Sequence, residues 1–400
     1  MKTWERLTTG SAIIFYLLIA LEVILMVTPF SVYFYSLYAP VLNGLEGSPK
    51  TAWLTAFFLP HISYSGDFLL ATLAYVGPLL IAAGLGIFFL CAFQVYSAKL
   101  LKKGVVKWGL YSYLRHPQYL GFSIAGLGLL LYWPRFFILI AFITMLFIYY
   151  LLARNEEWRM ERKYGDSYRS YMERIPGMFL PYNLGGNLFA WITRGTERKG
   201  LALALLYLAS LVGGIGTALA LREYTKAQVP IFFDRGLIVV STSPIRGSEL
   251  GRITKATLRS EAVQPVLNRF HREGHTIVAY IFPREYMMQH IIADLGEHEA
   301  HHGKEEKNVL WSTISHLAEM YALKPMRQLR DGRASSDKRV IFTEAKTPSG
   351  KDVPVAAALD AGVLRYPLFL AEVDAEQGKV LLTMELPKRH AWGNIPVPAF

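Results

Sequence analysis

The chain has little of two things that a soluble enzyme usually contains, cysteine and charge. It holds a single cysteine, Cys91, which excludes a disulfide framework and any zinc site built on several cysteines. Charged residues make up 18% of the 400 residues, below the roughly 25% of an ordinary soluble domain. Hydrophobic residues make up 52% and aromatic residues 14%, which excludes an intrinsically disordered chain. This composition indicates a membrane protein.

Long apolar runs predict five membrane spans in the first half of the chain, because about 20 apolar residues cross a bilayer. The predicted spans cover residues 11–38, 68–98, 117–133, 135–153 and 200–221. Only Trp133-Pro134-Arg135 separates the third from the fourth, so we expect a hairpin of two short helices. The first run is too long for a signal peptide. It contains Glu22, which is either functional or a paired structural residue.

Basic residues are concentrated on one side of these predicted spans. Residues 1–221 contain 18 Lys and Arg, and 16 of them fall on the side that includes the N-terminus. Cytoplasmic loops are rich in Lys and Arg, so this side is predicted to be cytoplasmic. The excess of basic residues behind the net charge of +11 therefore mainly orients the protein in the membrane, and we expect no nucleic-acid partner.

A fifth crossing by residues 200–221 predicts that residues 222–400 lie on the outer face of the cell membrane. The glycines 213, 214 and 216 leave an alternative open, in which this run lies in the interface and the domain stays cytoplasmic. Two further glycine pairs, Gly84/Gly86 and Gly126/Gly128, lie inside predicted spans. There they favour close helix packing over the glycine-rich turn of a doubly wound methyltransferase.

Side chains that carry chemistry gather at the cytoplasmic mouth of the third predicted span. Residues 105–121 read VVKWGLYSYLRHPQYLG, and the hairpin then leads to Arg154-Asn155-Glu156-Glu157. Pro117 suits the first turn of a helix, which puts His116 just outside the membrane and Tyr119 one turn inside. The hairpin returns the two glutamates to the same level. Such a cluster can hold a cationic cofactor, although the same residue types are also typical of a plain interfacial anchor.

The ordered motifs resemble those of the integral-membrane methyltransferases. They are G-x-Y-x-x-x-R-H-P-x-Y-x-G at 109–121, a hairpin, the doubled glutamate, and Y-G-x-x-Y-x-x-Y at 164–171. The resemblance covers about residues 70–182 and is to the isoprenylcysteine carboxyl methyltransferase and phospholipid methyltransferase family. It implies S-adenosylmethionine as cofactor at the cytoplasmic face. It also implies a membrane-embedded or amphiphilic acceptor, such as an isoprenylcysteine-like carboxylate or a phospholipid amine.

The resemblance also implies site residues. The predicted cofactor-binding residues are Val105, Val106, Tyr111, His116, Pro117, Gln118, Tyr119 and Glu157. The family has an arginine just before the glutamates that meets the substrate, and Arg154 is the candidate here. The predicted catalytic residues are Arg154 and Glu156, and no metal is expected.

Two other functions are compatible with the motifs. Membrane sterol reductases, which use NADPH, share an Arg-His-Pro-x-Tyr-like segment and a Tyr-Gly-x-x-Tyr-like tail. Gln118 and the doubled glutamate favour methyl transfer over reduction. The third hypothesis is a catalytically inactive membrane anchor for the C-terminal domain.

Residues 222–400 are predicted to form a soluble α+β domain that resembles no family we recognise. The patterns predict strands at 231–240 and 276–282, a helix at 305–323, and a hairpin of 363–373 with 379–386. The chain is thus predicted to be a multi-pass α-helical membrane protein with a C-terminal α+β domain.

One further motif lies in the C-terminal domain. Residues 298–302 match H-E-x-x-H, but Gly296 and Gly303 bracket them. A zinc peptidase carries this motif inside a longer helix, so a solvated polar turn is the favoured interpretation. A structural metal site is the alternative.

Overall fold

The computed structural model of the protein divides into two compact units, which are described separately. The helical unit comprises residues 1–38, 76–133 and 137–217, and the sheet unit comprises residues 39–75, 134–136 and 218–400. The residues that the structure describes are 24, 26–33, 39–59, 67–101, 105–180, 198–234, 237–241, 245, 247–272, 275–283 and 337–386.

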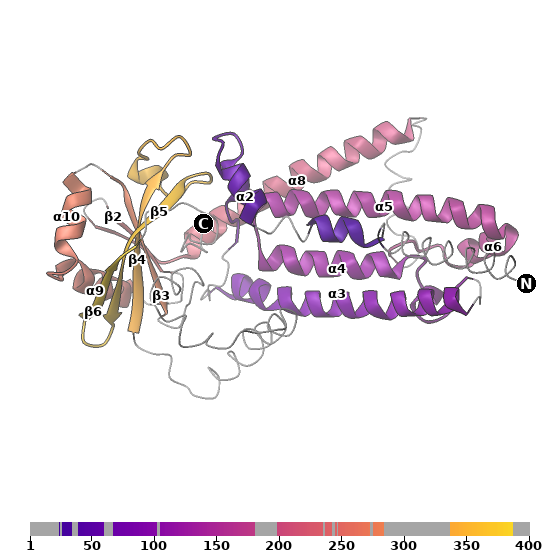
Figure 1. Ribbon diagram of the computed structural model, residues 1–400, viewed down its shortest axis with the longest axis horizontal. Coiled ribbons are helices and arrows are strands. Elements are labelled where there is room, and N and C mark those ends of the chain that lie inside the picture. Colours follow the sequence, from indigo (N-terminus) through magenta and orange to yellow (C-terminus); the bar gives the residue numbers. More distant parts are fainter. Residues whose placement is uncertain are drawn as a thin grey trace, which may run out of the picture. The chain divides into compact units, whose positions relative to one another are not determined.

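Three helices in the described residues are long and apolar enough to cross a membrane. They are α3 (Phe68–Leu100), α5 (Phe136–Tyr164) and α8 (Lys199–Gln228). A fourth, α4 (Pro117–Tyr132), pairs with α5 as the predicted hairpin. Within the helical unit, α3, α4 and α5 lie side by side along their lengths (Figure 1).

The five predicted spans are confirmed only in part. The runs at 68–98, 135–153 and 200–221 lie within α3, α5 and α8. Because α4 has only 16 residues, it extends about 24 Å, less than the roughly 30 Å of a hydrocarbon core. His116-Pro117 fixes its start and Pro134 follows its end. Most of the first predicted span, with Glu22, lies outside the described residues.

Glycines bring α3 and α4 into close contact, as predicted for Gly84 and Gly128. A Cβ atom at Gly84 would lie 2.3 Å from the backbone nitrogen of Ala125. One at Gly128 would lie 2.6 Å from the carbonyl oxygen of Gly77. Such distances leave no room for a side chain, so the two backbones pack directly on each other. Gly86 differs, since a Cβ there would meet nothing within 4 Å.

Shorter elements flank these helices. In the helical unit, η2 (Gly109–Ser112) precedes α4 and α6 (Asp166–Arg174) follows α5. In the sheet unit, α2 (Ala39–Glu46) and η1 (Ala52–Thr55) precede α3.

A six-stranded sheet forms the centre of the sheet unit, with its strands in sequence order. The strands are β1 (Ile231–Asp234), β2 (Leu237–Ser241), β3 (Ile277–Pro283), β4 (Asp337–Lys346), β5 (Leu364–Asp374) and β6 (Lys379–Glu385). Among the described strands, only β2 and β3 pair in parallel, and the crossover between them carries α9 (Gly247–Arg259) and α10 (Gln264–Arg272). The other neighbours are antiparallel.

Both faces of this sheet bury apolar side chains. On one face, Leu250 and Ile253 of α9 pack with Val239, Ile277 and Phe342 of the strands, and Figure 1 shows α9 and α10 against the sheet. Alternating strand residues, such as Ile238, Val278 and Ile341, point to the other face, where they pack with Ala358. The helices therefore cover one face and the segment before β5 contributes to the other.

The predicted elements of this unit have mixed outcomes. The strand at 276–282 is confirmed as β3, and the 363–386 hairpin is confirmed as β5 paired with β6. The single strand predicted at 231–240 is wrong, because the chain reverses and Asp234 pairs with Leu237. The predicted helix at 305–323 and the H-E-x-x-H motif lie outside the described residues.

Two buried arginines join the parts of the sheet unit. Arg222 in α8 donates to the carbonyl oxygens of Phe57 and Leu359, the latter at 2.7 Å. Arg135 donates to the carbonyl oxygen of Thr55, and its guanidinium lies 3.9 Å from the centroid of the Phe57 ring. The side chains of Arg135 and Arg222 thus donate hydrogen bonds to backbone carbonyl oxygens of residues 55, 57 and 359.

Candidate functional site

The start of α4 is held in place by a backbone clip. Arg115 N donates to the carbonyl oxygen of Gly177 at 2.9 Å, and His116 N donates to that of Met178 at 3.1 Å. His116 is the residue before the first turn of α4, and Pro117 occupies the first helical position. Proline fits there because its missing N–H needs no partner. The clip and the helix together fix the position of the buried His116 side chain.

Two carboxylates from α5 face the two sides of the His116 ring. Nδ1 lies 3.5 Å from Oε2 of Glu156, and Nε2 lies 3.4 Å from Oε1 of Glu157. Both distances exceed those of good hydrogen bonds, so these contacts are ion pairs with room to shorten. Both members of the doubled glutamate therefore lie against His116.

The environment of His116 favours its charged form. Burial opposes a charge on the ring, but the attraction of the Glu156 and Glu157 carboxylates outweighs burial. Together they raise the pKa of His116 above its ordinary value of 6.5. His116 therefore carries a proton more readily than a free histidine does.

Two arginines contact the same glutamate. Arg115 Nε lies 3.1 Å from Oε1 of Glu157, and Arg154 NH1 lies 3.3 Å from its Oε2. The side chain of Arg115 is only 11% exposed, whereas that of Arg154 is 61% exposed. The prediction named Arg154 and omitted Arg115, although Arg115 directly precedes His116 in the motif.

Aromatic rings form one wall of the cluster. The Tyr119 ring stacks on the rings of His116 and Tyr149, with centroids 5.6 Å and 4.9 Å away. Its hydroxyl donates to Oε2 of Glu156 at 3.2 Å. Tyr149 lies on α5, inside an apolar run, so no pattern in the sequence distinguished it as a site residue. Stacked rings of this kind offer electron-rich faces next to the carboxylates.

A second group of predicted residues lies just before α4. The hydroxyl of Tyr111 donates to Oε1 of Gln118 at 2.8 Å. The hydroxyl of Tyr171 in α6 donates to the backbone carbonyl of Tyr111 at 2.8 Å, which holds that segment in place. Val106 is buried against Tyr111 and residues of α3, so this segment belongs to an apolar core cluster.

The structure thus gathers most of the predicted site residues into two adjoining groups. The charged group holds Arg154, Glu156, Glu157, His116 and Tyr119. The apolar group holds Val106, Tyr111 and Gln118. Pro117 acts through its backbone, and Val105 is half-buried next to Val106. The roles of these residues remain predictions.

A separate cluster in the sheet unit has the ligand types of a metal site. His275 Nδ1 lies 2.8 Å from Oε1 of Glu344 and 3.2 Å from Oδ1 of Asp352. The ammonium of Lys346 lies 3.0 Å from the same Oε1 of Glu344. Because a cation already lies among these carboxylates, we assign no metal to the cluster.

Comparisons with known proteins agree with the motifs. Residues 68–167 match the family model described as phospholipid methyltransferase, and this segment contains α3, α4 and α5 with both glutamates. No curated protein and no solved structure matches the chain. The family is one of methyltransferases, which supports an enzyme that works at a membrane. Residues 68–167 are therefore a phospholipid-methyltransferase-like membrane segment, as the ordered motifs predicted.

Proposed function

We propose that the protein transfers a methyl group from S-adenosylmethionine to a lipid or lipidated acceptor at the cytoplasmic face of the membrane. The observation that carries the proposal is the placement of His116 between Glu156 and Glu157. These side chains lie at the mouth of the α4–α5 hairpin, inside the segment that matches the family.

The side chains at this mouth fit such a cofactor. It carries a sulfonium, an ammonium and a carboxylate, and when bound it supplies an electrophilic methyl group. Glu157 is suited to hold the ammonium, and Arg115 is suited to hold the carboxylate, since opposite charges attract strongly where water is partly excluded. Val106 and Tyr111, which pack in an apolar cluster with α3, are suited to line the site of the adenosine portion.

The same cluster can manage a proton. An amine acceptor must lose a proton before it can attack, whereas a carboxylate acceptor is already nucleophilic. Because the raised pKa of His116 favours its charged form, Glu156 is the unprotonated group that can accept the proton, although His116 and Tyr119 outweigh burial and lower the pKa of its carboxyl. The hydroxyl of Tyr119, 3.2 Å from Glu156, holds that carboxylate in position.

Arg154 is suited to meet the acceptor rather than the cofactor. Its side chain is 61% exposed while still reaching Glu157 at 3.3 Å. An exposed guanidinium at the membrane surface can pair with a lipid phosphate or with an acceptor carboxylate. This proposal keeps the predicted catalytic role of Arg154 and adds Arg115 as a cofactor-binding arginine.

We also propose that the C-terminal domain lies on the opposite membrane face from this site. Two observations support it. Helix α8 is continuous over 30 residues, or about 45 Å, without a break at its glycines. The basic residues before α8 match a cytoplasmic start, and one crossing then leads outside.

Binding measurements test the activity. Purified protein in neutral detergent is titrated with S-adenosylmethionine and, separately, with NADPH in a calorimeter. Binding of S-adenosylmethionine alone supports methyl transfer, whereas binding of NADPH alone replaces it with a sterol-type reductase. Lipid extracts from cells with and without the protein, compared by mass for the addition of CH₂, then identify the acceptor.

Cysteine labelling tests the topology. In a Cys91→Ala background, Lys351→Cys marks an exposed position of the sheet unit and Arg159→Cys an exposed position near the end of α5. A membrane-impermeant thiol reagent should label Lys351→Cys in intact cells and Arg159→Cys only after lysis. Labelling of both positions only after lysis would place the C-terminal domain inside the cell.

A further inference from the structure

A hollow on the sheet unit is lined by an excess of positive charge. It has a volume of about 1030 Å³ and lies along α9 and the turn between β5 and β6. Its lining contains four cationic residues, Arg252, Lys255, Arg259 and Lys379, and one acidic residue, Glu261. We call this hollow the α9 groove.

The α9 groove is more positively charged than the rest of its domain. Residues 222–400 contain 24 Lys and Arg against 21 Asp and Glu, so the domain as a whole is nearly balanced. The groove alone carries a net charge of +3, which equals the net charge of the entire domain. A local excess of this kind attracts anions.

Two other arginines of the sheet unit pair with carboxylates, whereas the groove cations have no such pair among the residues that the structure describes. Arg339 lies 2.8 Å from Glu372, and Arg269 lies 3.4 Å from Glu385. Among the described residues, no carboxylate forms an ion pair with the four cations of the α9 groove. Their charges are therefore available to a bound anion.

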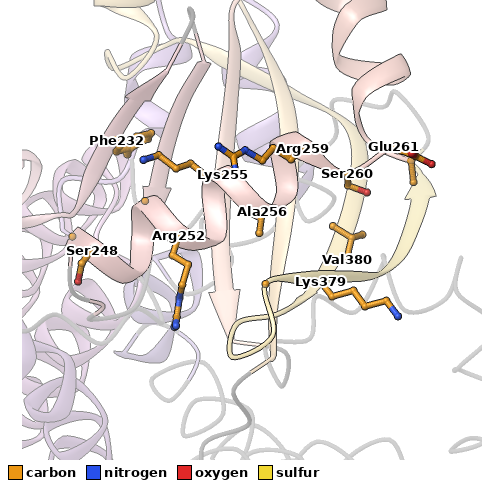
Figure 2. Close-up of a pocket in the computed structure, with 14 residues that line it drawn as sticks. Phe232, Ser248, Arg252, Lys255, Ala256, Arg259, Ser260, Glu261, Lys379 and Val380 are labelled. Carbon is orange, nitrogen blue, oxygen red and sulfur yellow. The ribbon is translucent and has the colours of Figure 1, made fainter.

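The helix places these cations where one ligand can meet several of them. Lys255 and Arg259 are four residues apart and lie on one side of α9, and Arg252 is one turn before Lys255. Figure 2 shows Lys255 and Arg259 beside each other, with Arg252 projecting from the other edge of the helix. The small residues Gly251 and Ala256 keep the space between them open.

We propose that the α9 groove binds a small ligand that carries a phosphate group. Arginine and lysine are the usual partners of phosphate, and Gly247 and Ser248 bring the N-terminus of the 13-residue helix α9 to one end of the groove. Phe232 and Val380 in the lining offer apolar contact to the body of the ligand. The phosphate belongs either to an anionic lipid headgroup or to a soluble compound.

Two probes distinguish these sources in full-length protein purified in neutral detergent. Inorganic pyrophosphate represents the soluble source, and short-chain phosphatidylglycerol represents the headgroup, with short-chain phosphatidylcholine as the zwitterionic control. The test variant is Arg252→Gln/Lys255→Gln/Arg259→Gln. The control variant, Arg269→Gln/Lys338→Gln/Lys351→Gln, removes the same charge from positions outside the groove.

The groove variant should bind at least one probe about tenfold or more weakly than the wild type, since each lost charged hydrogen bond weakens binding severalfold. The control variant should change by less than about twofold, because salt screens distant charges. Ala256→Glu should weaken binding like the groove variant, without removing a cation. Both variants should still bind S-adenosylmethionine, so failure here is separate from failure of the proposed methyl transfer.

Three results would overturn the proposal. They are binding of neither phosphate probe by the wild type, equal losses in the groove and control variants, and tighter binding of hexaglutamate than of either phosphate probe. Loss of pyrophosphate binding in the groove variant would assign a soluble ligand. Loss of phosphatidylglycerol binding alone would assign a lipid headgroup.

Discussion

Arg115 in the candidate site and the pair Arg135 and Arg222 in the sheet unit are all little exposed, but their partners differ in kind. In the candidate site, Arg115 lies 3.1 Å from the carboxylate of Glu157, beside a buried histidine. In the sheet unit, the buried Arg135 and Arg222 donate to backbone carbonyls of Thr55, Phe57 and Leu359. At Arg115 two charged groups are paired, and a charged ligand can replace one of them. At Arg135 and Arg222 the arginine donates to neutral backbone oxygens.

The difference separates a binding function from a structural one. A carboxylate shared by Arg115, Arg154 and His116 can give up one of these partners to an incoming ammonium. A backbone carbonyl that loses its donor gains nothing in return and remains desolvated. Substitutions in the two regions should therefore affect different measurements, ligand affinity in one and unfolding in the other.

The largest expected effect is on the stability of the sheet unit. Arg222→Met keeps a long apolar side chain but leaves the carbonyls of Phe57 and Leu359 without this donor, at a cost of roughly 2–6 kcal/mol in unfolding free energy. Thermal unfolding in detergent measures the loss. The control, Arg269→Met, removes an exposed pair with Glu385 and should cost less than about 1 kcal/mol. Equal stability of both variants would contradict a structural role for Arg222.

The next effect is on cofactor binding. Glu157→Gln should weaken S-adenosylmethionine binding by about 30-fold or more, because the cofactor ammonium loses a buried negative partner. Glu161→Gln is the matched control one turn further along α5, where Glu161 pairs with the exposed Arg169. Calorimetry on both variants tests the difference. Wild-type affinity in a folded Glu157→Gln variant would leave the cluster as an interfacial anchor.

A smaller effect distinguishes the two arginines at Glu157. We expect Arg115→Gln to reduce cofactor affinity about tenfold, because its side chain is 11% exposed and lies in the buried part of the cluster. Arg154→Gln, at a position 61% exposed, should change cofactor affinity less than about threefold and act mainly on the Michaelis constant for the acceptor. The reverse order would assign Arg154 to the cofactor and Arg115 to the acceptor.

The smallest expected effect is a dependence on pH. Because its partners raise the pKa of His116 in the folded protein, the protonated ring stabilises the fold. This contribution is complete below the ordinary pKa of 6.5 and is lost as the pH rises through the raised value. Thermal unfolding of wild type and His116→Gln from pH 6 to 9 measures it. The variant should lose less stability than the wild type over this range, and parallel curves would contradict the raised pKa.

The sequence by itself determined the features that depend on local pattern. Uncharged runs predicted the long helices, and Trp133-Pro134-Arg135 predicted the turn of the hairpin. The turn before Lys379 predicted the pairing of β5 and β6. Each follows from residues close together in the chain, whose periodicity and turn preferences act without distant partners. The motif at 109–121 and the doubled glutamate were also sufficient to predict the family match.

Only the tertiary structure decided which distant residues meet. The clip at Gly177 and Met178 turns Arg115 towards Glu157, and the rotation of α5 leaves Arg154 largely exposed. The partners of Arg222 come from positions 57 and 359, far from it in the chain. The α9 groove likewise combines a helix with a strand more than a hundred residues later. Such contacts depend on packing between separate elements, and no local pattern encodes them.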